Sequence, residues 1–80
     1  MKAKEIFEKL GFKCDICDDQ ITYYKTIKHP ITKEIVEYNI TFYLDIKRFE
    51  CFTNKIEYAN DLGIEELQAI NKQVEELGWK

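Results

Sequence analysis

Apolar residues recur at two spacings along this chain, one typical of helices near its ends and one typical of strands in its middle. Over residues 64–77 they lie three or four positions apart, which places them on one face of a helix: Ile64, Leu67, Ile70, Val74 and Leu77. Glu65 and Glu66 fall in the first turn, where the helix dipole favours acids, and Gly63 or Asp61 can cap the start. We predict a helix here with the whole stripe buried, Leu67 and Ile70 included.

Glycines mark the points where two helices should end. A short helix is predicted over about residues 2–10, where one face collects Ala3, Ile6, Phe7 and Leu10. Gly11 follows this helix and Gly78 follows the C-terminal one, at the position where left-handed backbone ends a helix without steric cost. We expect Phe12 and Trp79, the next residues, to fold back against the last turns.

Between the helices the apolar period shortens to two. Residues 36–44 alternate so that one face of a strand carries Val36, Tyr38, Ile40, Phe42 and Leu44. Three further segments are rich in β-branched and aromatic residues, and they are Phe12–Cys17, Gln20–Ile27 and Phe49–Thr53. Turns are expected at Asp18–Asp19, Lys28–Lys33 and Asp45–Arg48, and Lys55–Ala59 is a candidate for a short edge segment.

Connections this short imply hairpins, so the sheet should be an antiparallel meander. We predict one α+β domain over residues 1–80, with elements in the order α-β-β-β-β-α. Its two layers would be a sheet of three to four strands and, packed on one face, the N- and C-terminal helices. The other face is expected to meet solvent, and it carries Thr22, Tyr24, Thr26, Glu37, Asn39, Thr41 and Tyr43.

Charge is spread unevenly over the chain. The net charge of −3 lies in residues 55–80, which hold three lysines and six acids, whereas residues 1–54 hold nine basic and nine acidic residues. This acidity disfavours nucleic acid as a partner of the C-terminal segment. No apolar run approaches the roughly 20 residues that span a bilayer, so we expect a cytoplasmic protein without membrane contact.

The cysteines contain the one spacing that resembles a metal site. Cys14 and Cys17 are separated as in zinc sites, and Cys51 with His29 could complete a set of four ligands. In a strand, however, residues three apart point to opposite faces, and His29 belongs to a turn about a dozen residues further on. A small zinc-binding domain is therefore one alternative, and reduced thiols with no metal or cofactor are the main expectation.

Catalytic constellations are not evident. The chain has no serine, and His29 is its single histidine, placed in a His-Pro turn. A domain of 80 residues must also use most of its apolar side chains for its core, which leaves few for a substrate pocket. We predict that the protein is not an enzyme.

Binding is the remaining class of function. Tyrosine combines a large contact area with a polar tip, and we expect a partner-binding surface that includes Tyr24, Lys25, Tyr43 and Arg48. The expected partner is another protein, and a second copy of the chain in a homodimer is one form of it. The alternative is a nucleic-acid-binding module that stacks bases on the tyrosines and holds phosphates with lysines. Acids interleaved with those lysines, such as Glu37, weigh against it.

The two ends of the chain resemble a known group of proteins. Residues 1–12, MKAKEIFEKLGF, and residues 64–79, IEELQAINKQVEELGW, are similar to the ends of small uncharacterised proteins from prophages and mobile elements of low-GC Gram-positive bacteria. The resemblance implies a phage or mobile-element context, in which small acidic proteins often bind and modulate host proteins. It assigns no functional residue. Together with the residues above, it favours a non-enzymatic protein–protein interaction or regulatory module.

Overall fold

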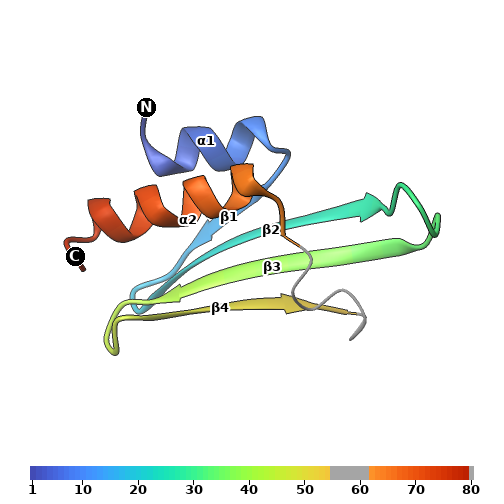
Figure 1. The fold of residues 1–80 in the computed structure, drawn as a ribbon. Coiled ribbons are helices and arrows are strands. Elements are labelled where there is room, and N and C mark those ends of the chain that lie inside the picture. Colours follow the sequence, from blue (N-terminus) through green and yellow to red (C-terminus); the bar gives the residue numbers. More distant parts are fainter. Residues whose placement is uncertain (55–61, 80) are drawn as a thin grey trace.

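The structure, a computed structural model, describes residues 1–54 and 62–79. This part of the chain contains two helices and four strands. In chain order they are α1 (Ala3–Lys9), β1 (Lys13–Ile16), β2 (Gln20–Lys28), β3 (Ile35–Tyr43), β4 (Arg48–Thr53) and α2 (Ile64–Glu76). The strands form one antiparallel sheet in the order β1-β2-β3-β4, and both helices cover the same face of it (Figure 1). The predicted two-layer α+β fold is confirmed. The candidate edge segment Lys55–Ala59 and the candidate cap Asp61 lie outside the described residues.

Both helices end as the glycines predict. Gly11 and Gly78 have φ values of 93° and 73°, which other residues rarely adopt. The Phe12 N–H then donates to the Phe7 carbonyl over 3.0 Å, and the Trp79 N–H donates to the Val74 carbonyl over 3.1 Å. These bonds return the chain toward the sheet directly after each helix.

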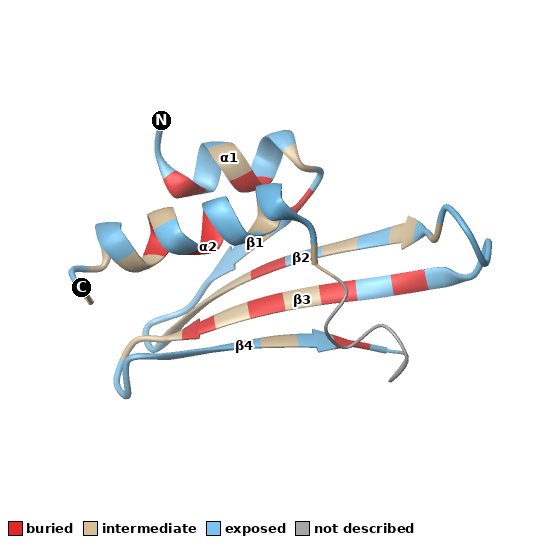
Figure 2. Ribbon diagram, in the orientation of Figure 1, coloured by how far each residue is buried: buried red, intermediate tan, exposed pale blue. Residues whose placement is uncertain are grey.

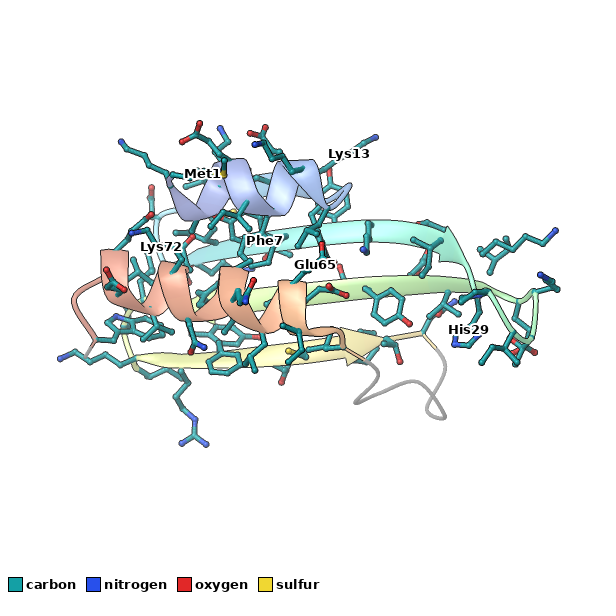
Figure 3. The ribbon with its side chains drawn as sticks, turned by 45° about the horizontal axis from the view of Figure 1, so that its top comes forward. Met1, Phe7, Lys13, His29, Glu65 and Lys72 are labelled. Carbon is teal, nitrogen blue, oxygen red and sulfur yellow. The ribbon has the colours of Figure 1, made fainter. Side chains whose placement is uncertain are left out.

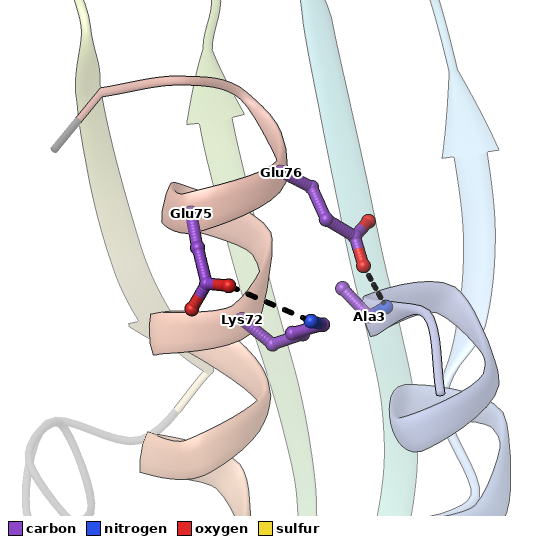
Figure 4. A network of polar contacts seen from close by, with 4 residues as sticks. All are labelled: Ala3, Lys72, Glu75 and Glu76. Carbon is purple, nitrogen blue, oxygen red and sulfur yellow. Dashed lines mark hydrogen bonds and ion pairs between the residues drawn. The ribbon is translucent and has the colours of Figure 1, made fainter.

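Glutamate side chains satisfy the N–H groups at the helix starts. Glu66 accepts from the Gly63 N–H over 3.3 Å, and Glu5 accepts from the Lys2 N–H over 3.0 Å. The Ala3 N–H donates to Glu76 Oε2 over 2.7 Å, so the last turn of α2 supplies an acceptor to the first turn of α1 (Figure 4). One carboxylate thus fastens the two helices to each other.

The core lies between the helices and the middle of β3. Val36, Tyr38, Ile40 and Phe42 are all 5% exposed or less, as their alternation predicts, and the residues between them are intermediate or exposed (Figure 2). Leu44, which follows the end of β3, is half-buried. The even-numbered residues of β3 therefore form the buried face, and the odd-numbered residues form the face away from the helices.

Tyr23 joins the layers at one point. Its ring stacks on Phe7 of α1 with centroids 3.8 Å apart, and its hydroxyl donates to Gln73 Oε1 of α2 over 2.6 Å. Phe7 lies between α1 and the sheet in Figure 3. Burial raises the pKa of Tyr23 well above its usual range, so the side chain remains a neutral hydrogen-bond donor around neutral pH.

The predicted burial of the α2 stripe is wrong at its first two positions. Ile64 and Leu67 are 68% and 49% exposed, whereas Ile70 is 3% exposed. The inward face of α2 instead includes Ala69 and Gln73. The hydrogen bond from Tyr23 to Gln73 fixes this rotation of the helix. The apolar periodicity of the sequence could not predict it, because Gln73 is polar and yet faces the sheet.

Truncation of a buried and of an exposed side chain of α2 should change the stability of the protein to different extents. We expect Ile70→Ala to lower the free energy of unfolding by about 2–4 kcal/mol, because a buried side chain is lost from the core. Leu67→Ala, the matched control, should cost less than about 1 kcal/mol because that side chain is half in water. Chemical denaturation of both variants measures the difference, and equal losses would contradict the rotation of α2 described here.

Candidate functional site

The face of the sheet away from the helices is not covered by any described element. Tyr24, Asn39 and Phe52 lie side by side across β2, β3 and β4, with Tyr24 opposite Asn39 and Asn39 opposite Phe52. Tyr24 is 40% exposed and Phe52 is 58% exposed. We call this side of the sheet the open face.

Hydroxyl groups continue the open face beside this row. The Thr22 and Thr41 hydroxyls lie 3.2 Å apart, and the Tyr43 hydroxyl donates to Glu50 over 3.5 Å. Because these side chains stand on a hydrogen-bonded sheet, their positions relative to one another are set by the strand register. The open face is a preorganised surface of aromatic rings and short polar groups.

Opposite charges balance on the open face. The strand pairing places three basic and three acidic residues there, namely Lys13, Lys28, Arg48, Asp15, Glu37 and Glu50. Such a surface has no excess positive charge with which to attract a phosphate backbone.

Three of the four predicted binding residues share the open face. Tyr24, Tyr43 and Arg48 lie there, and Arg48 is directly opposite Tyr43. Lys25 is on the helix side of β2, where its Nζ donates to the Leu10 carbonyl over 3.1 Å. Its Nζ also lies 4.4 Å from the centre of the Phe12 ring. Lys25 therefore secures the end of α1, and the structure does not bring it together with the other three.

Two exposed apolar residues of the open face were not singled out from the sequence. Phe52 faces Asn39, and Ile35, which is 55% exposed, faces Lys28. β4 carries aromatic rings on both of its sides, so its alternation alone does not show which ring is covered. The register with β3 decides this, because Phe49 pairs with the buried Phe42 and Phe52 does not.

The structure separates the candidate metal ligands. Cys14 pairs with Tyr23, Tyr23 pairs with Ile40, and Ile40 pairs with Cys51, so two whole strands lie between the two thiols. Three strand spacings amount to about 14 Å, far beyond the reach of one shared zinc ion. Cys17 is exposed after β1. Within residues 1–54 and 62–79, no group of three His, Cys, Asp or Glu side chains could hold a metal ion.

His29 stabilises the turn between β2 and β3. Its Nδ1 accepts from the Ile31 and Thr32 N–H groups over 3.2 and 3.4 Å, and its own N–H donates to the Glu34 carbonyl over 2.8 Å. A depression of about 290 Å³ beside it is lined partly by Ile27 and Tyr38. This volume falls just below the range of small-molecule sites. His29 follows the last residue of β2 and Cys17 precedes the first, so the two lie at opposite ends of this strand; Figure 3 shows His29 in its turn.

No family model, no curated protein and no solved structure matches the chain. Among the described residues, neither helix is long and apolar enough to cross a membrane.

The three thiols should differ in reactivity. Burial raises the pKa of both the Cys14 and the Cys51 thiol, so each holds less of the nucleophilic thiolate at pH 8. Cys17 is exposed and should be alkylated first. We expect iodoacetamide labelling followed by peptide mass spectrometry to show Cys17 modified at least several-fold faster than the other two. Equal protection of all three thiols, reversed by a chelator, would instead indicate a shared metal.

Proposed function

We propose that this protein is a non-enzymatic protein–protein interaction or regulatory module that binds its partner through the open face. The observation that carries this proposal is the row formed by Tyr24, Asn39 and Phe52, with two exposed aromatic rings on a rigid sheet. Aromatic rings and arginine are enriched at protein interfaces and dominate their binding energy. Tyr43 and Arg48 form a second opposed pair with the same chemistry, four positions further along β3 and β4.

The charges of the open face support a protein partner over a nucleic acid. Its three basic residues are matched by three acidic ones, and the Tyr43 hydroxyl is already hydrogen-bonded to Glu50. A sheet that stacks bases also needs cations along the path of the backbone. Lys25 belongs to the other side of the sheet, which removes one of the cations on which the nucleic-acid alternative relies.

The setting we propose is the cytoplasm of a bacterium, with the module acting on a host protein on behalf of a phage or mobile element. The resemblance of the two terminal segments supports this origin. All three cysteines are free thiols, which fits a reducing compartment.

Site-specific photocrosslinking tests the open face as a docking surface. A photoreactive phenylalanine analogue replaces Tyr24 or Tyr43 on the open face, or the exposed Gln68 of α2 as the matched control. In lysate of a low-GC Gram-positive bacterium, we expect the same protein to be captured from both open-face positions and not from position 68. Tyr24→Ala should then weaken binding of that purified protein about tenfold or more.

Two results would contradict the proposal. Capture from position 68 alone would place the docking surface on the helix side. A mobility shift with nucleic acid at low salt that disappears as salt rises, without any protein capture, would favour the nucleic-acid alternative.

A further inference from the structure

The two edges of the sheet are protected differently. β1 has only four residues, and α1 packs against it. β4 has six residues with no lysine or proline among them, and no described element lies along its outer edge (Figure 1). Short strands, charged side chains (lysine above all) and prolines are the usual devices that keep an edge from pairing with another chain. β4 has no lysine or proline, and its two charged side chains, Arg48 and Glu50, carry opposite charges.

The backbone of β4 offers hydrogen-bonding groups to a neighbour. The Asn54 N–H donates to the Glu37 carbonyl of β3 over 3.3 Å. Because the direction of backbone groups alternates along an antiparallel strand, Glu50 and Phe52 also face β3. Phe49 and Cys51 therefore direct their N–H and C=O groups outward, away from the sheet.

Exposed phenyl rings lie on both sides of this edge. Phe49, on the helix side, contacts Phe42 with ring centroids 5.8 Å apart and yet remains 48% exposed. Phe52, on the open face, is 58% exposed. A strand placed along β4 would cover part of each ring.

We infer that two copies of this chain pair through their β4 edges, antiparallel about a two-fold axis. Phe49 of each copy would lie opposite Cys51 of the other. This register uses the outward groups of both residues, gives about four backbone hydrogen bonds, and joins the two sheets into one. Antiparallel pairing of identical strands is self-complementary, so the same surface serves both copies.

Charges in this register explain why a second copy fits and also limit its affinity. Arg48 would lie opposite Phe52 of the other copy and diagonal to its Glu50, which are two favourable neighbours for a guanidinium. The two Glu50 carboxylates would lie opposite each other at the axis, which is unfavourable. Removal of that charge should therefore strengthen the dimer.

The contact area predicts a weak association. A phenyl ring offers roughly 150–250 Å², and about half of each of the four rings is available, so the rings contribute on the order of 400 Å². With the backbone of two short strands, the total remains below the roughly 1,600 Å² of a standard interface. We expect a dissociation constant in the micromolar range, roughly, and a concentration-dependent dimer.

Dimerisation and the proposed partner binding share two side chains, Arg48 and Phe52, but they can be tested separately. The dimer uses the backbone edge of β4, whereas the partner is proposed to dock on the open face, which also includes Tyr24 and Asn39 of β2 and β3. Tyr24 variants therefore report on partner binding alone, and a backbone change at Cys51 reports on the dimer alone.

Sedimentation velocity over a series of concentrations tests the dimer. The wild-type chain should shift from a 9.6 kDa monomer toward twice that mass as its concentration rises. Phe52→Lys should weaken association about tenfold or more. Glu50→Gln should strengthen it about threefold, because it removes the repulsion at the axis. Tyr24→Lys, on the open face but away from the edge, is the matched control and should leave association unchanged.

A backbone variant gives a second measure. Cys51→Pro removes an N–H that points away from β3, so it should abolish the dimer while leaving the ladder with β3 in place. Circular dichroism checks that this variant is folded. If it is not, the weaker association expected of Phe52→Lys remains the test of the dimer. A wild-type chain that remains monomeric at roughly millimolar concentration, well above the expected dissociation constant, would overturn the inference. So would a dimer that is broken by Tyr24→Lys and not by Phe52→Lys.

Discussion

The side chain of Tyr23 is the contact on which the arrangement of this fold depends. It is 2% exposed, stacks on Phe7 of α1 and donates a hydrogen bond to Gln73 of α2, so one residue of β2 positions both helices. A buried amide left without a partner would cost free energy, and this bond therefore selects the rotation of α2 as well as its distance from the sheet. The bond from the Ala3 N–H to Glu76 then holds the helices to each other.

Anchoring of both helices on one face leaves the rest of the sheet uncovered by the described elements. A domain of 80 residues is too small to cover both faces of its sheet. Tyr24 and Phe52 on the open face are therefore exposed, although their neighbours in sequence are at least partly covered. For the same reason, no described strand or helix lies beside the outer edge of β4. The proposed partner surface and the proposed dimer edge are two consequences of the same one-sided core.

Much of the architecture follows from local rules in the sequence. Gly11 and Gly78 mark the helix ends because few other residues adopt their backbone angles, and the alternation of residues 36–44 fixes the buried face of β3. The site was less predictable. The prediction placed Tyr24 and Lys25 on one binding surface because of their residue types. The two are neighbours in a strand, however, so their side chains point to opposite faces of the sheet. The rotation of α2 depends on a bond between Tyr23 and Gln73, 50 residues apart, and no apolar pattern reveals such a polar pair.

Adjacent tyrosines permit a direct test of the role of Tyr23, since Tyr23 points into the core and Tyr24 points to the open face. Each can lose its hydroxyl alone, as Tyr23→Phe or Tyr24→Phe, with no other change in shape. Equilibrium denaturation should show that Tyr23→Phe lowers the free energy of unfolding by about 1–3 kcal/mol, because Gln73 loses its buried donor. Tyr24→Phe should change it by less than about 0.5 kcal/mol. Equal effects of the two substitutions, or a larger effect at Tyr24, would contradict the claim that Tyr23 joins the helices to the sheet.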